Sequence, residues 1–261
     1  MKAHALMYHD VVDANGVRGG FEGDGPAVYA VTEAAFRAQL DAIEATGAGA
    51  PVRAESLVAG SASVEPWLLT FDDGGSSAVS AGSELARRSW PAHFFIVTDL
   101  VGTPGFVDWD GVRELAAQGH VIGSHSASHP DHIASCSPAE LEREWSRSVV
   151  ALSEAIGAPV TTASVPGGYY STEVGRAAAA AGITCLFTSE PVTRAHPVEG
   201  YLLVGRYAVR NDTATADVAA AAAGRARPWL RQRVAWELRG IAKKAAGRHY
   251  RRLRAALLAR R

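Results

Sequence analysis

Two adjacent acids at the end of an apolar segment constrain this chain more than any other feature. Residues 67–71 read Trp-Leu-Leu-Thr-Phe, a run typical of a buried strand, and they lead directly into Asp72, Asp73 and two glycines. Neighbouring carboxylates at a buried position lose water and repel each other, which raises the pKa of one of them. An ordinary Asp-Gly turn after a strand is the competing interpretation. A functional pair therefore requires partner residues elsewhere in the chain.

His125 and His129 are such partners, because they follow a second apolar run at residues 121–124. One carboxylate and two imidazoles form a three-ligand set that suits zinc and leaves a position open for water. The other carboxylate of the acid pair is then free to accept a proton from that water. The four side chains together predict a metal site that activates water.

Apolar segments and helical segments alternate along the chain, which predicts parallel βαβ units and an α/β fold. In a βα barrel the ends of the parallel strands form one face, and that face carries the active site. The polar candidates follow strand ends, at His9-Asp10, Asp72-Asp73, His125 and Pro166-Gly167. The strands are expected at residues 3–8, 67–71, 92–97, 120–124, 160–165, 183–188 and 201–209, and the main helices at 32–46, 76–89, 109–118, 137–156, 171–181 and 213–223.

Length and composition indicate one large domain. The chain has 261 residues, of which 48% are hydrophobic, and its two cysteines, Cys136 and Cys185, provide no disulfide framework. The N-terminal segment lacks the form of a signal peptide, and no apolar run reaches the length of a transmembrane helix. We therefore expect a cytoplasmic protein.

Charge divides the chain into two parts. Residues 225–261 contain 13 of the 26 Lys and Arg residues and a single acid, Glu237, so this tail carries a net charge of +12. Residues 1–224 then carry −13. We expect a barrel domain over 1–224 and a separate basic helical tail over 225–261.

The tail also carries an apolar stripe, which makes it a basic amphipathic helix. Two interpretations of the tail compete. It packs on the acidic body, or it lies on an anionic membrane surface with Trp229 and Trp236 at the interface, which would place the protein at the inner face of the membrane. Nucleic acid is not an expected partner, because no aromatic-lined groove is evident. The stripe consists of Leu230, Val234, Leu238, Ile241 and Ala245.

Three motifs between Leu6 and about Val209 resemble the polysaccharide deacetylase family, the NodB-homology domain of carbohydrate esterase family 4. These motifs are Thr-Phe-Asp-Asp-Gly at 70–74, His-Ser-x-x-His at 125–129 and Pro-Gly-Gly at 166–168. The resemblance implies a distorted (β/α) barrel with about seven strands. It also implies a metal-dependent hydrolase that removes an N-acetyl group from an acetamido sugar in a glycan, an exopolysaccharide or a glycan precursor. The implied cofactor is a divalent metal, most often Zn²⁺.

Carried over to this sequence, the resemblance implies Asp72 as the catalytic base and Asp73, His125 and His129 as the metal ligands. The backbone N–H of Gly167, between Pro166 and Tyr169, would stabilise the oxyanion, and Tyr169 is placed to stack on a sugar ring. The N-terminal Tyr8-His9 pair is similar to that of circularly permuted members, in which this histidine is the general acid. A histidine suits that role because the leaving amine must be protonated near neutral pH.

The chain departs from the family pattern at two positions. Ser164 stands where many members have an arginine that orients the base, and the C-terminal motif that usually carries the general acid is not convincing, which leaves His196 as the rival of His9. The alternative functions are a deformylase or another amide hydrolase on the same scaffold. A non-catalytic glycan-binding protein is also an alternative, which Ser164 keeps open and the intact acid and histidine motifs oppose.

Overall fold

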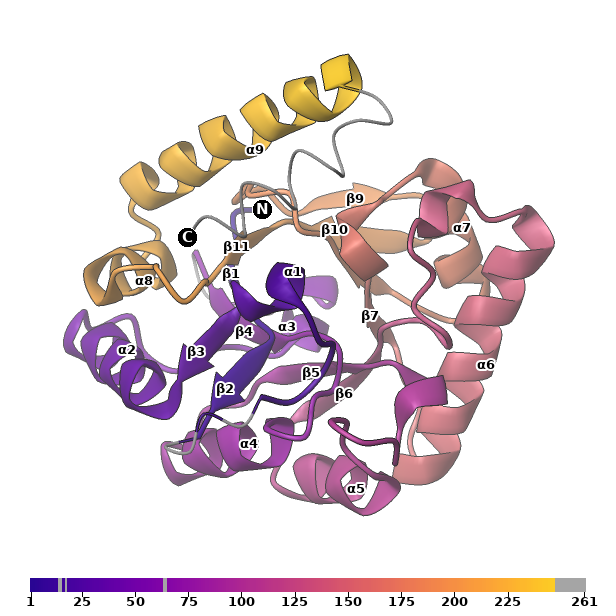
Figure 1. Ribbon diagram of the computed structural model, residues 1–261, viewed down its shortest axis with the longest axis horizontal. Helices are drawn as coiled ribbons and strands as arrows, with labels where there is room; N and C mark the ends of the chain where they lie inside the picture. Colours follow the sequence, from indigo (N-terminus) through magenta and orange to yellow (C-terminus); the bar gives the residue numbers. More distant parts are fainter. Residues whose placement is uncertain (14–15, 17, 63–64, 247–261) are drawn as a thin grey trace.

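The computed structural model describes residues 1–13, 16, 18–62 and 65–246, and its centre is a nine-stranded sheet (Figure 1). All neighbouring strands pair in parallel except β9, which is antiparallel to β10. The α/β fold on parallel strands is therefore confirmed. In sheet order the strands are β11 (Arg206–Ala208), β1 (His4–Tyr8), β4 (Trp67–Phe71), β5 (His93–Ile96), β6 (Val121–Ser124), β7 (Thr162–Ser164), β8 (Cys185–Phe187), β10 (Tyr201–Val204) and β9 (His196–Val198).

The strand predicted over 201–209 divides at Gly205 and connects the two ends of the sheet. Its first half, β10, pairs with β8, and its second half, β11, pairs with β1. A Cβ at Gly205 would collide with the carbonyl oxygen of Glu190 and the side chain of Val192, so only glycine fits at this bend. Among the described residues no ladder joins β9 or β10 to β11, so closure of the predicted barrel stays a prediction.

Three short strands were missed by sequence analysis, namely β9 and the parallel pair β2 (Asp10–Val12) and β3 (Ala30–Thr32). Strands of three residues are too short to show a period of two. The loop predicted over 13–27 lies between β2 and β3 and includes the short helix α1 (Asp24–Ala27). Because β2 follows β1 after a single residue, His9 lies at the junction of the two strands.

The predicted helices are confirmed, and they surround the sheet in Figure 1. The helix after Ser137 begins with a capping box, in which Ser137 and Glu140 satisfy each other's backbone N–H groups. The α-helices are α2 (Glu33–Ala45), α3 (Ala54–Val58), α4 (Ala78–Arg87), α5 (Trp109–Ala117), α6 (Pro138–Ile156), α7 (Thr172–Ala180) and α8 (Thr215–Ala222), and the 3₁₀ helices are η1 (Thr98–Leu100), η2 (Ile133–Ser135) and η3 (Pro166–Gly168).

Alternation along the strands separates two buried layers. Leu69 and Phe71 of β4 belong to the larger cluster, which also contains buried residues of the surrounding helices. Leu68 belongs to a smaller cluster with side chains from β1, β5 and β8. Since Leu68, Thr70 and Asp72 are each two residues apart, they lie on the face of the sheet that carries the smaller cluster. Asp72 therefore forms the polar end of that face.

Helix α9 (Ala226–Ala246) begins the predicted tail, and its first two turns pack on the body. Trp229 is 4% exposed, contacts Tyr207 and His4, and donates a hydrogen bond to the carbonyl of Ala221. Gln232 bonds both the N–H and the carbonyl of Ala208. Among the side chains that the structure describes, packing of the tail on the body is therefore seen near Trp229 and Gln232.

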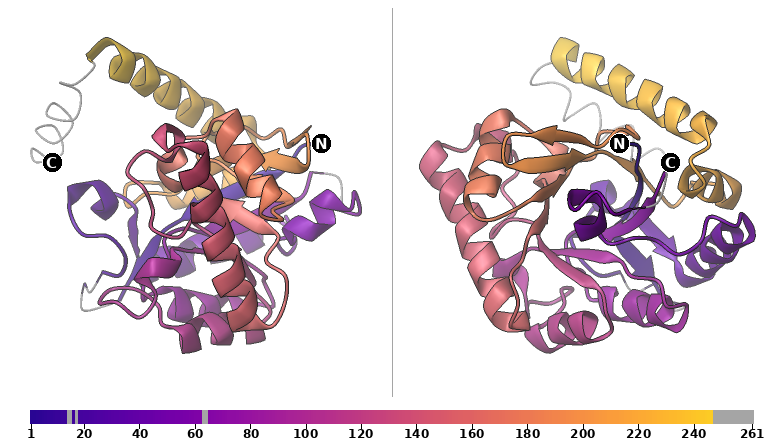
Figure 2. Two further views of the ribbon diagram at one scale, coloured as in Figure 1. Left: turned by 90° about the vertical axis from the view of Figure 1, so that its right-hand side faces the viewer. Right: turned by 180° about the vertical axis from the view of Figure 1, so that it is seen from behind.

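Residues 233–239 of α9 are exposed, and the helix lies along one side of the molecule (Figures 1 and 2). No helix within the described part of the chain is long and apolar enough to cross a membrane. The predicted continuation of the tail over 247–261 lies outside the described residues, and the division at 224/225 stays a prediction.

Candidate active site

Asp73, His125 and His129 form a cluster of three metal-ligating side chains at the ends of β4 and β6. Their ligand atoms all lie within 4.8 Å of one another. Nε2 of His125 is 3.4 Å from Oδ1 of Asp73, and Nε2 of His129 is 3.8 Å from the same oxygen. The structure therefore brings together the three residues that the sequence predicted as metal ligands.

The backbone that carries these ligands is held in an unfavourable conformation. Asp73, Ser126 and His129 have φ values of 75°, 63° and 56°, and they are three of the five non-glycine residues with positive φ in the described chain. Such conformations cost about 1–3 kcal/mol each and persist where surrounding contacts enforce them. The N–H of Ser126 donates to the Ser124 hydroxyl, and the N–H of His129 donates to the Ser126 hydroxyl. These two serines fix the turn between the histidines.

His125 is buried and oriented by a hydrogen bond on its other nitrogen. Its Nδ1 lies 2.9 Å from the carbonyl oxygen of Ser164, so Nδ1–H donates and the lone pair of Nε2 faces Asp73. Burial lowers the pKa of His125, but the neighbouring Asp72 and Asp73 carboxylates raise it more, and the net shift is upward. Burial, together with the charge of His125, lowers the pKa of His129 to about 4. A metal must therefore compete with a proton mainly at His125.

Asp72 does not join the cluster but lies behind it in a buried ion pair with Arg206 of β11. Nη1 of Arg206 is 2.6 Å from Oδ1 of Asp72, and Nη2 is 2.8 Å from Oδ2. The guanidinium is fully buried and also donates to the carbonyl of Thr188 and to the hydroxyls of Thr70 and Ser164. Burial alone would raise the pKa of Asp72, but Arg206 and His125 outweigh it and hold this pKa well below its usual range. Asp72 is thus a carboxylate at neutral pH.

Arg206 pairs with Asp72 in place of the arginine that is missing at Ser164, where the chain departs from the family pattern. The arginine expected on β7 is replaced by one on β11, and the Ser164 hydroxyl fills the space by accepting from Arg206 and donating to Asp72 at 3.2 Å. Sequence analysis missed Arg206, although a signal was present. An arginine in the middle of an apolar strand is costly unless a buried acid pairs with it, and Asp72 is such an acid.

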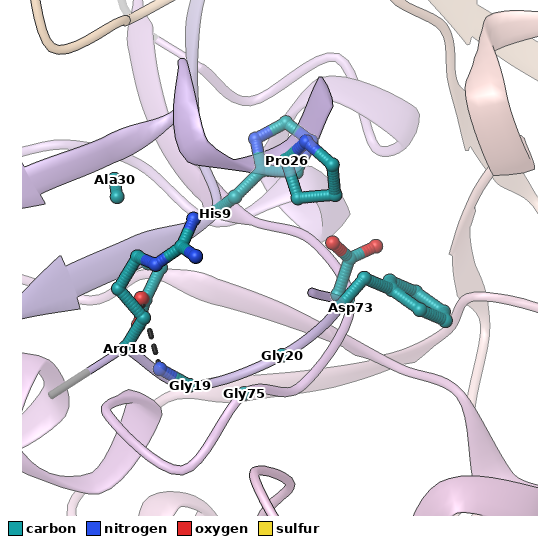
Figure 3. A pocket seen from close by; sticks show the side chains of 10 residues that line it. His9, Arg18, Gly19, Gly20, Pro26, Ala30, Asp73 and Gly75 are labelled. Carbon is teal, nitrogen blue, oxygen red and sulfur yellow. Dashed lines mark hydrogen bonds between the residues drawn. The ribbon is translucent and has the colours of Figure 1, made fainter. Parts of the chain in front are cut away.

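His9 lines a pocket together with the metal-ligand candidate Asp73. Its ring stacks on Tyr29 at 4.4 Å, and its buried Nδ1 has no hydrogen-bond partner among the described residues. Figure 3 shows His9 between Arg18 on one side and Asp73 on the other. The rival His196 lies exposed on the edge strand β9 and is not among the residues that line this pocket. The geometry favours His9 as the group that could donate a proton.

The predicted oxyanion segment forms η3, directly after β7. Pro166 is buried, and Gly167 is exposed with φ 60°, a conformation that favours glycine. Tyr169 stacks on His132 at 4.0 Å between ring centroids. None of the three predicted residues lines the pocket that contains His9 and Asp73, so their contact with a substrate stays a prediction.

Comparisons with known proteins bear on the family of the chain. Residues 59–186 match the family model for polysaccharide deacetylase. Peptidoglycan-N-acetylglucosamine deacetylase PgdA of Listeria monocytogenes is 45% identical over 65 residues, which cover 24% of this chain and 13% of that protein. Chitooligosaccharide deacetylase of Rhizobium leguminosarum bv. trifolii is 36% identical over 78 residues, covering 29% and 34%. The match with a gellan lyase of Bacillus sp. covers only 4% of that protein, so the chain spans a minor part of each of these relatives.

Solved structures share the fold over most of the chain. Streptococcus pyogenes deacetylase PplD, in complex with acetate, aligns with a TM-score of 0.69 at 20% identity and covers 82% of this chain and 95% of its own. IcaB from Ammonifex degensii aligns with a TM-score of 0.68 at 24% identity and covers 85% and 97%. At these identities the likeness establishes the fold.

Proposed function

The chain belongs to the polysaccharide deacetylase family, and from this we propose that it is a metal-dependent hydrolase acting on acetamido sugars. The reaction would remove the N-acetyl group from a sugar in a glycan, an exopolysaccharide or a glycan precursor. One observation carries the proposal, namely the Asp73–His125–His129 cluster beside a carboxylate, Asp72, that is held as an anion. The same proposal includes that the chain is one of the circularly permuted members of the family, which its Tyr8-His9 pair resembles.

The donor set fits a divalent metal. One carboxylate oxygen and two imidazole nitrogens are the ligands of catalytic zinc sites, and the Nδ1 bond to Ser164 leaves Nε2 of His125 free to bind. When bound, such an ion polarises an acyl carbonyl and lowers the pKa of water. We propose Zn²⁺ on the basis of this donor chemistry.

The protein's own residues would divide the proton transfers between them. Asp72, kept ionised by Arg206, accepts a proton from the attacking water. His9, in the pocket with Asp73, donates a proton to the departing amine, because an amide anion is too basic to leave unprotonated. The Gly167 N–H would donate to the oxyanion, and Tyr169 would contact the sugar ring.

Arg206 also bears on the alternative functions. The missing arginine at Ser164 kept a decayed, non-catalytic site open as an alternative, and the ion pair between Arg206 and Asp72 weakens that argument. A deformylase or another amide hydrolase remains the alternative, since the same residues would hydrolyse a formamide.

A panel of acetylated and formylated amino sugars, assayed with and without a chelator, tests the proposal. We expect release of acetate from an N-acetylated sugar, loss of that activity with chelator and recovery with Zn²⁺. Faster release of formate than of acetate would assign the deformylase. Saturable sugar binding without hydrolysis, at full metal content, would assign the binding protein.

We further propose that the protein works at an anionic membrane surface on the cytoplasmic side, bound there through the basic tail over 225–261. Five of the eight exposed large hydrophobic residues in the described chain lie on α9. They are Leu230, Val234, Trp236, Leu238 and Ile241. Exposed arginines of the same helix supply charge complementary to anionic lipid.

A further inference from the structure

The segment Arg18–Phe21 is docked against the turn that carries Asp73. A Cβ on Gly19 would lie 2.7 Å from the backbone nitrogen of Ser76, and a Cβ on Gly75 would lie 2.9 Å from the nitrogen of Gly20. The N–H groups of Gly20 and Ser76 both donate to the carbonyl of Gly105, at 2.6 and 2.9 Å. The close approach depends on backbones without side chains. This segment is therefore a fixed wall of the pocket.

The two residues at the ends of this wall face the candidate active site. Phe21 contacts the ring of His129 with centroids 4.7 Å apart. Arg18 lines the same pocket as His9 and Asp73, and Figure 3 shows it on the side of the pocket opposite Asp73. A molecule whose acetamide group lies at Asp73 would thus have Arg18 on its other side.

Arg18 forms no ion pair with the described part of the chain, although its charge acts on the nearby Asp10, where burial raises the pKa of the carboxyl and Arg18 is among the groups that lower it. No described carboxylate lies within 4.0 Å of its guanidinium, and its one protein hydrogen bond, to the carbonyl of Gly23, is long at 3.5 Å. Asp10, which lines the same pocket, already accepts from the Ser77 hydroxyl at 2.5 Å and from the Gly19 N–H at 2.9 Å. Arg206 is the opposite case, because both of its terminal nitrogens bond Asp72. Arg18 thus presents an unpaired cation to the occupant of the pocket.

From this geometry we propose that Arg18 binds an anionic group, a phosphate or a carboxylate, that belongs to the substrate. The inference rests on the proposed function and narrows its substrate class to acetamido sugars with an acidic substituent near the acetamide. A neutral acetamido sugar offers hydroxyl groups, whereas the planar guanidinium matches two oxygens of an oxyanion. The fixed backbone of Gly19 and Gly20 holds the base of the Arg18 side chain beside the pocket before the substrate arrives.

Three substrates and three variants test the proposal. The substrates are methyl N-acetylglucosaminide, N-acetylglucosamine 1-phosphate and N-acetylmuramic acid, which are neutral, a phosphate and a carboxylate. The variants are Arg18→Met, Arg18→Lys and the control Arg113→Met, whose exposed arginine pairs with Asp110 on α5. We expect wild-type kcat/KM to favour one acidic substrate over the neutral one by about 10–100-fold, the worth of a charged hydrogen bond. Arg18→Met should abolish that preference mainly through KM, Arg18→Lys should keep part of it, and Arg113→Met should retain it.

The acid that is favoured identifies the anion as a phosphate or a carboxylate. Equal kcat/KM for all three substrates in the wild type, or an unchanged preference in Arg18→Met, overturns the inference and leaves the deacetylase proposal standing. Calorimetric binding of N-acetylglucosamine 1-phosphate and N-acetylmuramic acid to wild type and Arg18→Met separates the two proposals if no hydrolysis occurs. Weaker binding of either acid to the variant supports the role of Arg18, and equal binding of both overturns it.

Discussion

The buried ion pair at the end of the sheet and the exposed apolar face of α9 differ in whether their side chains contact suitable partners within the chain. Inside, the buried guanidinium of Arg206 and the carboxylate of Asp72 bond each other and the surrounding hydroxyls. Outside, Leu230 and Ile241 are 63% and 64% exposed and belong to neither hydrophobic core formed by the described residues. The first region has its partners within the chain, whereas the second has no apolar partner among the described residues and is the contact proposed for a membrane surface. Substitutions inside should therefore change stability and catalysis, and substitutions on α9 should act only when that surface is present.

The largest effect is expected at the metal cluster. Replacing Asp73, His125 or His129 by alanine removes one of three ligands, so each variant should lose both stoichiometric metal and activity. Elemental analysis of the purified variants measures the metal, and acetate release measures the activity. Full zinc content in His125→Ala would contradict the ligand assignment.

Asp72→Asn is the matched control for the cluster, because it changes the neighbouring acid and keeps its shape. We expect it to retain the metal and to lose most activity, since an amide cannot accept the proton. A variant that loses metal as fully as Asp73→Ala would show that the two acids share one role, contrary to their separate contacts in the structure.

His9 is half-buried at the pocket, between the fully buried ion pair and the exposed face of α9 in accessibility. Its replacement should affect catalysis alone. We expect His9→Ala to lower kcat by about 10²–10⁴-fold, the usual contribution of a positioned acid, with full zinc content. The high-pH limb of the rate profile should flatten in this variant, because that limb reports loss of the donated proton. His196→Ala is the control, and a large effect there with near-normal His9→Ala would assign the acid to β9.

Breaking the interior ion pair should cost stability as well as activity. Arg206→Met leaves the Asp72 carboxylate buried without its partner, so we expect the free energy of unfolding to fall by about 3–5 kcal/mol. Because Arg206 keeps the folded pKa of Asp72 below its unfolded value, this contribution is present above pH of about 4 and is lost as the pH falls through the folded pKa.

Urea denaturation at pH 7 and at pH 3 measures this contribution, and the difference between wild type and Arg206→Met should shrink at the lower pH. Arg206→Lys is the control, since it keeps the charge without the two-pronged contact. An equal difference at both pH values would mean that lost packing, rather than the ion pair, explains the effect.

Much of this interior could be predicted from the sequence because its signals are local. The acid pair, the two histidines and the seven apolar strands follow from short apolar runs and from fixed spacings along the chain. Arg206 could not be placed in this way, because its partner Asp72 is 134 residues away and only the seam between β11 and β1 brings them together. The loop over 13–27 was predicted, but its place beside Asp73 was not, since this depends on close backbone contact with the turn after β4 rather than on a local pattern.

The smallest intrinsic effect is expected on α9. Leu238→Glu combined with Ile241→Glu should leave folding and activity on a soluble substrate unchanged, since both side chains are exposed and the buried anchor Trp229 is retained. Binding to vesicles that contain anionic lipid should be lost, because each basic residue near such a surface contributes only about 1 kcal/mol and the apolar stripe must supply the rest. Val150→Glu, at an exposed apolar position on α6, is the matched control and should bind like the wild type. Co-sedimentation at low and high salt measures the effect. Wild-type binding that is equally strong to neutral vesicles, or unaffected by the double substitution, would show that α9 is not the contact, and the exposed stripe would then need another partner.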